Sequence, residues 1–282
     1  MGITPAMKEG SGMVNFEKEY PERFYDVAIA EQHSVTFAAG LSLEGLKPVV
    51  AIYSTFLQRG YDQFIHDVCL ENIDVTFAID RAGIVGEDGP THTGSFDISF
   101  MRCIPNIVIS CPSNEHELWH LLNICYEHKG PAAIRYPRGS GIGVQPIPNE
   151  VEGFEIGKAK KIKDGQSVCI LNFGVLMDQI DQIAEKKDYT LYDMRFIKPI
   201  DQDALEHAMQ HETIITLEDN TLLGGCGSAI GEKLHKQKFK GNLLSIGLKD
   251  EFPAHGSRNE ILRQNGLDEE SIQKTIDNFL RN

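Results

Sequence analysis

Short apolar runs alternate with longer amphipathic segments along most of this chain. Val, Ile, Ala and Phe dominate the apolar runs, and the segments between them repeat apolar residues at the spacing of a helix face. In the first half the predicted strands are 24–30, 47–54, 74–80, 106–112 and 131–137, and the predicted helices are 31–45, 58–72 and 114–128. Short buried strands separated by helices indicate a parallel sheet covered by helices on both faces.

The same alternation returns in the second half, after a polar break. Glycine, proline and polar residues cluster at 138–157, which is typical of a linker between domains. Beyond it the predicted strands are 166–174, 189–196, 213–219 and 242–248, with helices at 175–187 and 201–212. We therefore expect two doubly wound α/β domains, the second smaller, with boundaries at 1–142, 143–157 (the linker) and 158–282. Residues 2–4 resemble the tail of a strand, so we expect the first domain to lack its beginning.

The composition excludes several function classes. The chain has 282 residues and a formal net charge of −14 without a long basic run, which argues against nucleic acid as a partner. No stretch approaches the roughly 18 consecutive apolar residues of a membrane span, and the first residues lack a secretory pattern, so we expect a cytoplasmic location and no membrane partner. The six cysteines have apolar neighbours and no CxxC pair, which predicts reduced, buried thiols and no structural metal.

Candidate chemistry gathers where the predicted strands end. In open parallel sheets, ligands bind beyond the carboxyl ends of the strands. Glu31, Phe56 and Arg81 follow the first three predicted strands, and Arg138 follows the strand at 131–137. One edge of the sheet therefore presents a carboxylate, an aromatic ring and two guanidinium groups.

A glycine-rich loop follows Arg81. The sequence GEDGPTHTG (86–94) is too rich in turn residues for a strand or a helix. Its glycines let the backbone approach a ligand or adopt positive φ, while Asp88 and His92 supply charge and a proton carrier. A tight surface turn is the simpler interpretation of the loop taken alone.

Each residue at a strand end has a structural and a chemical interpretation. Glu31 is either a first-turn acid favoured by the helix dipole or a desolvated carboxylate that passes a proton to a heteroaromatic nitrogen. Phe56 is either a core residue or a platform for a flat ring. Arg81 and Arg138 either form surface ion pairs or clamp a phosphate with bidentate, permanently charged donors.

Five segments together carry a resemblance to a known family. They are DVAIAEQH (26–33), AIYSTFLQR (51–59), DRAGIVGEDGPTHTGSFD (80–97), RYPRG (135–139) and RFIKP (195–199). Along nearly its whole length the chain resembles the 1-deoxy-D-xylulose-5-phosphate synthases, thiamine-diphosphate enzymes related to transketolase. The AEQH and DRAG…EDGxTHxG segments separate that family from ordinary transketolases and from the β subunits of 2-oxo-acid dehydrogenases.

The resemblance implies a reaction and a role for each candidate residue. The reaction condenses pyruvate with D-glyceraldehyde 3-phosphate to 1-deoxy-D-xylulose 5-phosphate and carbon dioxide, in isoprenoid, thiamine and pyridoxal precursor synthesis. Glu31 would hydrogen-bond N1′ of the aminopyrimidine of thiamine diphosphate and so turn the cofactor's amino group into a base. Phe56 would stack on that ring, with Arg59 supporting the same wall. The implied substrate residues are Tyr53, Arg81, Asp88, His92 and Arg138, with the arginines toward phosphate and His92 toward proton transfer or the pyruvate-derived group.

One part of the family's pattern is absent from this sequence. The family binds Mg²⁺ and the diphosphate through a GDG…N segment on a separate N-terminal domain, and GEDG (86–89) and KDGQ (163–166) lack the asparagine. The resemblance therefore implies a transketolase-type pyrimidine-binding domain followed by a transketolase C-terminal domain, with the N-terminal domain missing. Since most cofactor affinity should come from the diphosphate and its metal, we expect weak or no cofactor binding and no turnover by this chain alone. Family members are dimers, so a homodimer is expected.

Two other motifs suggest different functions. HELWH (116–120) matches the zinc-protease pattern, but the apolar stripe of its helix predicts that both histidines lie on a solvated face. LLGGCGSAIGE (222–232) is one residue out from the dinucleotide fingerprint and is interpreted as close helix packing, near a subunit interface as the resemblance implies, with Glu218 as a buried polar anchor.

Three function classes remain open. The first is part of a thiamine-diphosphate carboligase, which includes a β-type subunit of transketolase or of a 2-oxo-acid dehydrogenase. The second is a zinc peptidase, and the third is a non-catalytic α/β interaction module. We prefer the first because a module without chemistry has no physical need for so many reactive side chains at its strand ends.

Overall fold

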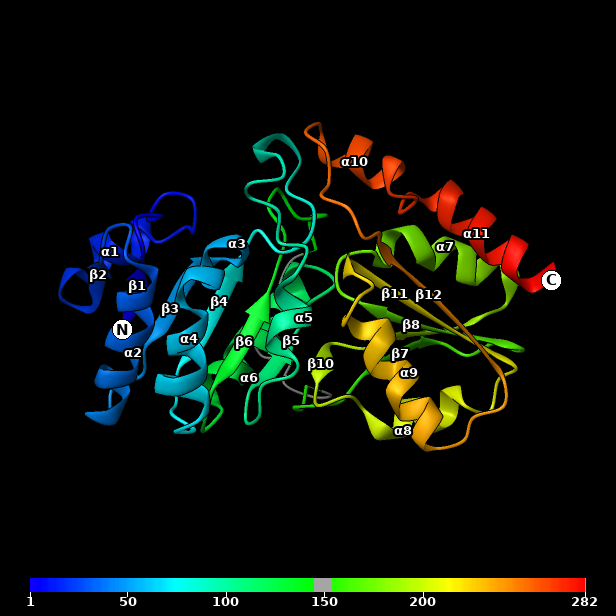
Figure 1. The fold of residues 1–282 in the computed structure, drawn as a ribbon, viewed down its shortest axis with the longest axis horizontal. Coiled ribbons are helices and arrows are strands. Elements are labelled where there is room, and N and C mark those ends of the chain that lie inside the picture. Colours follow the sequence, from blue (N-terminus) through cyan, green and yellow to red (C-terminus); the bar gives the residue numbers. More distant parts are fainter. Residues whose placement is uncertain (145–153, 282) are drawn as a thin grey trace.

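The computed structural model describes residues 1–144 and 154–281, which form two α/β sheets side by side (Figure 1). This confirms the predicted fold class. The first sheet has seven strands in the order β10-β5-β6-β4-β3-β1-β2, and the second has five in the order β12-β11-β8-β9-β7. The predicted linker at 143–157 falls partly on residues 145–153, which lie outside the described residues.

The first sheet is parallel except for β10 at its edge. Its strands are β1 (Gly2–Thr4), β2 (Phe24–Asp26), β3 (Val49–Tyr53), β4 (Thr76–Asp80), β5 (Val108–Ser110), β6 (Ala132–Arg135) and β10 (Phe196–Lys198). Its α-helices are α1 (Val14–Glu19), α2 (Glu31–Leu43), α3 (Ser54–Leu57), α4 (Tyr61–Gln63), α5 (Asp97–Met101) and α6 (Glu115–Glu127). Strands β3, β4 and β6 are buried almost throughout, as expected for central parallel strands covered on both faces.

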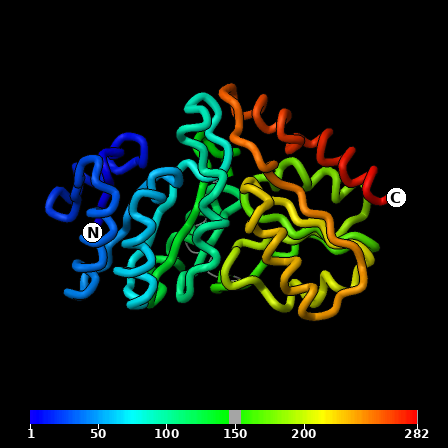
Figure 2. The backbone as a smooth tube through the Cα atoms, viewed as in Figure 1, coloured from blue at the N-terminus to red at the C-terminus, as the bar shows by residue number. Residues whose placement is uncertain are grey.

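The second sheet is also parallel, apart from the antiparallel strand β7. Its strands are β7 (Lys160–Lys163), β8 (Val168–Phe173), β9 (Thr190–Asp193), β11 (Thr213–Thr221) and β12 (Asn242–Leu248). Its helices are α7 (Met177–Lys187), α8 (Gln202–Ala208), α9 (Cys226–Lys236), α10 (Arg258–Gln264) and α11 (Glu269–Arg281). The backbone trace starts beside the outer strands of the first sheet and ends at the far side of the second (Figure 2).

Strand β10 interlocks the two halves of the chain. The sequence pattern predicts one strand at 189–196 within the second domain, but β9 stops at Asp193 and Arg195 adopts a positive φ of 54°. This turn sends Phe196 to Lys198 back to the first sheet, where they pair with β5. Phe196 is fully buried there, so the crossing places apolar side chains from the second half in the core of the first.

Two predicted elements are shorter or less regular than their patterns suggested. The expected strand at 24–30 ends at Asp26, because Asp26 Oδ1 accepts hydrogen bonds from the amides of Ala6 and Ala28, at 3.0 and 2.9 Å, and Ala28 turns at φ 58°. The expected helix at 58–72 is divided into a 3₁₀ turn, one α turn and a π segment (Phe64–Cys69).

All six cysteines are free thiols, but Cys103 is exposed rather than buried.

Within residues 1–144 and 154–281, no helix is long and apolar enough to cross a membrane.

Candidate active site

Glu31 begins α2, and its side chain is almost fully enclosed. The residue is 3% exposed, and Arg59 Nη1 donates to its Oε1 at 2.6 Å. Gly60 lets the chain that carries Arg59 approach α2, since a Cβ there would lie only 3.2 Å from the Glu31 carbonyl oxygen. No hydrogen bond to Oε2 occurs within the described part of the chain. The carboxylate is therefore desolvated, charge-paired on one oxygen and open to a donor on the other.

Aromatic rings form a row next to the end of β3. The Tyr53 and Phe56 rings stack with centroids 5.6 Å apart, and His92 meets Phe56 edge-on at 5.4 Å. The guanidinium carbon of Arg59 lies 4.9 Å from the Phe56 centroid, and that of Arg81 lies 3.9 Å from the Tyr53 centroid. The structure thus brings these five sequence-predicted residues into one continuous set of contacts.

The glycine-rich loop is held closed at its base. Gly83 and Gly94 form an antiparallel bridge, with both amides donating to the opposite carbonyl at 2.9 Å. A Cβ on Gly94 would lie 2.1 Å from the Arg81 carbonyl oxygen, so the two limbs of the loop can meet only without a side chain there. Thr55 Oγ1 donates to the Thr91 carbonyl at 3.2 Å and ties the loop tip to α3. Hydrogen bonds therefore fix the loop both at its base and at its tip, next to the ends of the strands.

The other loop glycines serve contacts with the second half of the chain. Gly86 and Gly89 have φ of 68° and 71°, as the sequence led us to expect. A Cβ on Gly86 would lie 2.9 Å from the Arg258 amide nitrogen, and one on Gly89 would lie 3.2 Å from the His255 ring. The loop therefore packs on the segment that leads into α10, a role that the local sequence pattern did not reveal.

Both candidate phosphate-binding arginines have acidic partners. Arg81 pairs with Asp80 and donates from Nη1 to the Gly10 carbonyl at 2.9 Å. Arg138 Nη1 contacts Glu87 Oε2 at 2.6 Å, and its Nε lies 3.1 Å from Asp88 Oδ2. Burial raises the pKa of Asp80, and the neighbouring Arg81 opposes that rise. Both arginines therefore form ion pairs in the structure, and both also line the cavity described next.

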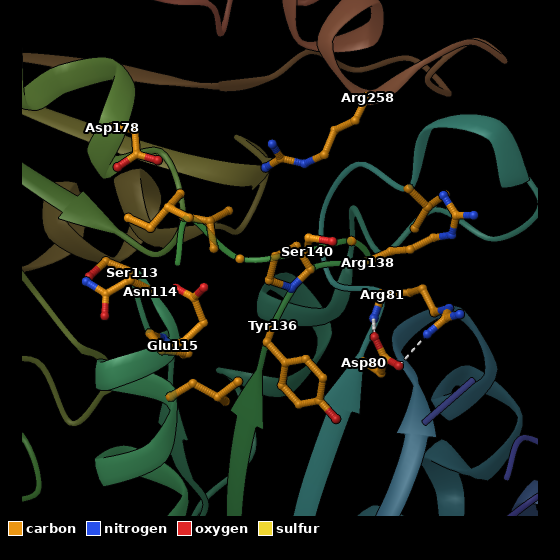
Figure 3. A pocket seen from close by; sticks show the side chains of 18 of the residues that line it. Asp80, Arg81, Ser113, Asn114, Glu115, Tyr136, Arg138, Ser140, Asp178 and Arg258 are labelled. Atoms are coloured by element: carbon orange, nitrogen blue, oxygen red, sulfur yellow. Dashed lines mark hydrogen bonds and ion pairs between the residues drawn. The ribbon is translucent and has the colours of Figure 1, made fainter. Parts of the chain in front are cut away.

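A cavity of about 910 Å³ lies between the two halves of the chain (Figure 3). Arg81, Tyr136 and Arg138 line it from the first sheet, and Asp178 and Arg258 line it from the second. Glu31, Phe56, Arg59 and His92 do not line it but connect to it through Tyr53 and Arg81.

Some cavity-lining residues were missed by the sequence analysis. Gly10, Ser11 and Gly12 form part of the wall, and their GSG string was the only local signal. No local sequence pattern pointed to Asp178 or Arg258, because they reach the cavity only through the docking of the two sheets.

Comparisons with known proteins match both halves of the chain. The family "Transketolase, pyrimidine binding domain" matches residues 1–142, and "Transketolase, C-terminal domain" matches residues 157–272. The chain belongs to the transketolase family. It is 54% identical over 282 residues to a 1-deoxy-D-xylulose-5-phosphate synthase of Idiomarina loihiensis, which covers 100% of this chain and 45% of that protein. It is 55% identical over 281 residues to the synthase of Cellvibrio japonicus, covering 99% of this chain and 44% of that protein. The chain therefore spans less than half the length of these curated relatives.

Solved structures show the same architecture. A structure described as "Split gene transketolase, inactive beta4 tetramer" superposes with a TM-score of 0.85 at 26% identity, covering 98% of this chain and 90% of that one. Transketolase from Campylobacter jejuni superposes with a TM-score of 0.75 at 18% identity, covering 98% of this chain and 43% of that one. The second likeness supports the transketolase fold alone.

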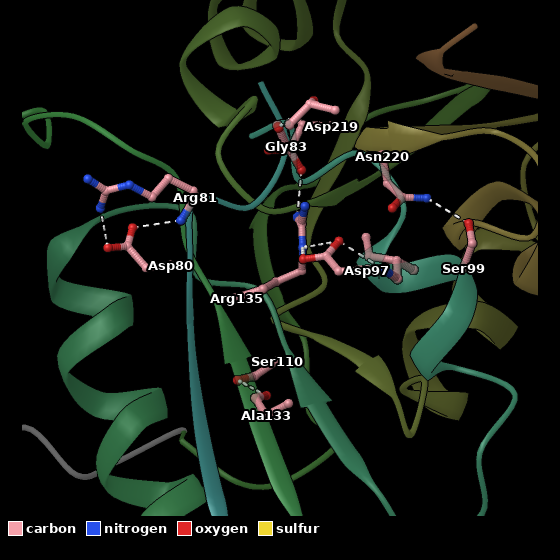
Figure 4. A network of polar contacts seen from close by, with 12 residues as sticks. Asp80, Arg81, Gly83, Asp97, Ser99, Ser110, Ala133, Arg135, Asp219 and Asn220 are labelled. Carbon is pink, nitrogen blue, oxygen red and sulfur yellow. Dashed lines mark hydrogen bonds and ion pairs between the residues drawn. The ribbon is translucent and has the colours of Figure 1, made fainter. Parts of the chain in front are cut away.

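A buried ionic network joins the two domains of this transketolase family member (Figure 4). Arg135, at the end of β6, lies with Nε 3.0 Å from Asp97 Oδ2 and Nη1 2.6 Å from Asp219 Oδ1. Burial next to a second acid raises the pKa of Asp97, and Arg135 opposes that rise. Arg135 belongs to the RYPRG segment, so this part of the family pattern supplies a contact that holds the two sheets together.

The glycine-rich turn before α9 packs tightly, as the sequence predicted. Glu218 is fully buried and accepts from the amides of Cys226 and Gly227, both at 2.8 Å. Its burial raises the pKa to about 7, against the effect of those two amides. A Cβ on Gly225 would lie 2.2 Å from Glu218 Oε2, which explains the glycine. The prediction of Glu218 as a buried polar anchor is confirmed.

The prediction that HELWH forms a solvated helix face is wrong. His116 and His120 are 9% and 5% exposed, and the ring of Phe154 stacks on His120 at 4.4 Å. Glu117 is also buried and pairs with Arg195. The apolar stripe of the helix misled the prediction because the second half of the chain covers the polar side of α6. Within residues 1–144 and 154–281, no group of three or more His, Cys, Asp or Glu side chains could hold a metal ion.

Proposed function

We propose that this chain is part of a 1-deoxy-D-xylulose-5-phosphate synthase, which condenses pyruvate with D-glyceraldehyde 3-phosphate using thiamine diphosphate and Mg²⁺. The observation that carries the proposal is the row of contacts that links Glu31 and Phe56 to the cavity-lining Arg81, in a chain that is 54% identical to such a synthase over all of its 282 residues. We place the reaction in isoprenoid, thiamine and pyridoxal precursor synthesis, in the cytoplasm.

The residues present fit the aminopyrimidine half of thiamine diphosphate. Glu31 offers a buried carboxylate with Oε2 available, which suits hydrogen bonding to a ring N–H. The half-buried Phe56 stacks on Tyr53 and offers an aromatic ring for stacking on the aminopyrimidine. Arg59 keeps Glu31 charge-paired and flanks the Phe56 ring, so it supports both contacts.

When bound, the cofactor supplies the nucleophilic carbon that the condensation needs. The role of Glu31 is to hold a proton on the aminopyrimidine nitrogen in a desolvated environment, where the interaction is strong. Phe56 orients the ring, and the loop above it excludes water.

Of the proposed substrate residues, Arg81 and Arg138 line the cavity, and Tyr53, Asp88 and His92 lie behind them. Arg81 and Arg138 are placed to bind a phosphate, and the pair of Arg138 with Glu87 is solvent-exposed and therefore easily exchanged. Tyr53 and Asp88 orient the substrate's polar groups. His92 packs on Phe56 and hydrogen-bonds to Thr91 through Nδ1 at 2.9 Å, which suits a group that moves a proton near the ring.

The metal and the diphosphate are assigned to an N-terminal portion outside this chain. Mg²⁺ needs oxygen ligands arranged as an octahedron, and the Glu31 region offers one carboxylate already paired with Arg59. We propose that the chain alone neither binds the cofactor tightly nor turns over, and that the complete protein is a homodimer.

The test is product formation from pyruvate and D-glyceraldehyde 3-phosphate with thiamine diphosphate and Mg²⁺. The chain is assayed alone, and fused behind the N-terminal remainder of the Idiomarina loihiensis relative. We expect activity only in the fusion, and loss of activity with Glu31→Ala. Glu44→Ala, an exposed change near the end of the same helix, is the control and should be silent. A folded fusion without activity, or an active Glu31→Ala fusion, would overturn the proposal.

A second candidate is a β-type transketolase subunit that works beside a separate partner chain. The split-gene transketolase structure favours it, since this chain covers 90% of that one. The two candidates are separated by assaying the same fusion with ketose phosphate donors instead of pyruvate. Activity with the ketose donor and none with pyruvate would favour the second.

A further inference from the structure

Arg258 brings a third guanidinium group to the cavity, from the second half of the chain. It is the first residue of α10, and its side chain reaches toward the cavity across from Arg138 (Figure 3). The close approach of its amide nitrogen to Gly86 fixes it next to the loop that carries Glu87 and Asp88. Its position is therefore set by the docking of the two domains.

The charge of Arg258 is unmatched by a direct contact. Its Nε is buried without a hydrogen-bond partner, and its guanidinium forms no ion pair within residues 1–144 and 154–281. The other two cavity arginines each pair with acids, Arg81 with Asp80 and Arg138 with Glu87 and Asp88. An anion that enters the cavity thus finds one guanidinium whose donors are unused.

Asp178, on the same cavity wall, interacts electrostatically with Arg258 without touching it. Burial, together with Asp181 and Glu115, raises the pKa of Asp178, whereas Arg258 lowers it. The two side chains form no ion pair at contact distance among the described residues. Because a guanidinium cannot lose its proton in a protein, the remaining charge must be met by water or by a bound anion.

We propose that Arg258 binds the phosphate group of a small phosphorylated substrate, so that the second domain completes the substrate site. The cavity volume of about 910 Å³ lies within the range of small-molecule sites. A planar guanidinium with free donors matches phosphate geometry, and Arg258 has more unused donors than either arginine of the first domain. The identity of the substrate as D-glyceraldehyde 3-phosphate rests on the proposed function, whereas the phosphate contact does not.

The direct test is calorimetric titration of the full chain with inorganic phosphate. We expect Arg258→Ala to weaken binding about 10-fold or more, since a charge-assisted hydrogen-bond pair is lost. Arg258→Lys, which keeps the charge but not the fork, should recover part of that loss. Arg263→Ala removes an exposed arginine from the same helix and should leave binding unchanged. Unchanged affinity in Arg258→Ala, or an equal loss in Arg263→Ala, would overturn the proposal.

The kinetic test separates this inference from the proposed function. In the active fusion, Arg258→Ala should raise the KM for D-glyceraldehyde 3-phosphate about 10-fold and leave the KM for pyruvate, which has no phosphate, unchanged. An active fusion in which neither KM changes would contradict the inference and leave the function standing. If the fusion is inactive but phosphate binding still depends on Arg258, the function falls and the inference stands.

Discussion

Arg195 and Glu117 lie 78 residues apart and form a buried, two-point ion pair. Nε lies 2.7 Å from Oε2 and Nη2 lies 2.8 Å from Oε1, and the two side chains are 4% and 3% exposed. The Phe154 ring covers the guanidinium carbon at 4.0 Å from its centroid. Because Glu117 lies in the first turns of α6, next to the cavity-lining Glu115, the pair holds the second half of the chain against one cavity wall.

Removing one partner of this ion pair should lower the stability of the folded chain. Among the described residues, Arg195→Met leaves the buried Glu117 carboxylate with only Lys160, whose Nζ lies 4.0 Å from Oε1, as a counter-charge, so the free energy of unfolding should fall by about 3 kcal/mol. Urea denaturation followed by circular dichroism measures the change. Arg263→Met, an exposed change, should stay within about 0.5 kcal/mol of the parent. A loss below about 1 kcal/mol in Arg195→Met would show that the carboxylate is solvated or compensated in solution.

Asp193 should give the stability a distinct pH dependence. Burial and the nearby Glu117 raise its pKa to about 7, and Ser113 Oγ donates to its Oδ2 at 2.5 Å. Between roughly pH 4, where an unfolded aspartate titrates, and pH 7, the folded chain keeps a proton that the unfolded chain has released. Stability therefore falls as pH rises through this window, by at most about 1.4 kcal/mol per pH unit, and the loss is complete above the folded pKa.

Asp193→Asn removes that titration while preserving the side-chain shape. Plotted against pH between about 4 and 7, its free energy of unfolding should decline less steeply than that of the parent. Asp62→Asn, at an exposed position, should follow the parent curve. Parallel curves for Asp193→Asn and the parent would refute the raised pKa of Asp193 in the folded chain.

The sequence was sufficient for the fold class and for the inner part of the candidate site. Alternation of apolar runs and helices implies parallel strands, and parallel strands bring their ends to one edge. For that reason Tyr53, Phe56 and Arg81 could be placed together before their contacts were known, and the structure shows their rings and guanidinium in contact.

The outer wall of the cavity could not be predicted in the same way. Arg258 and Asp178 reach it only because the two sheets dock, and docking depends on contacts between residues distant in sequence. The same cause explains the error over His116 and His120, whose polar helix face is covered from the other half of the chain. Local periodicity reports which side of a helix is apolar, but not what covers the remaining side.

Gly86 should be more sensitive to substitution than another glycine with positive φ. Gly86→Ala combines left-handed strain with a Cβ placed 2.9 Å from the Arg258 amide nitrogen, a backbone atom that cannot rotate away. We expect a loss of at least about 2 kcal/mol in the free energy of unfolding. Gly45 has a φ of 81° and no atom within 4 Å of the position that a Cβ would occupy, so it provides the matched control and should lose only about 1 kcal/mol on change to Ala. Equal losses at the two positions would mean that the loop does not rest on α10 in solution.

Phe56 should determine cofactor affinity if the proposed function is correct. Its ring contacts Tyr53, His92 and Arg59, and replacing it with Leu keeps an apolar side chain but removes the flat face needed for stacking. In the active fusion, Phe56→Leu should raise the thiamine diphosphate concentration for half-maximal activity about 10-fold, from the loss of aromatic stacking and its buried area. Phe239→Leu changes another partly buried aromatic, in the second domain, and should leave that concentration unchanged provided the fusion stays folded. The same half-maximal concentration in Phe56→Leu and the parent would remove Phe56 from the cofactor site, because a ring that stacks on the aminopyrimidine cannot be replaced by an aliphatic side chain without loss of affinity.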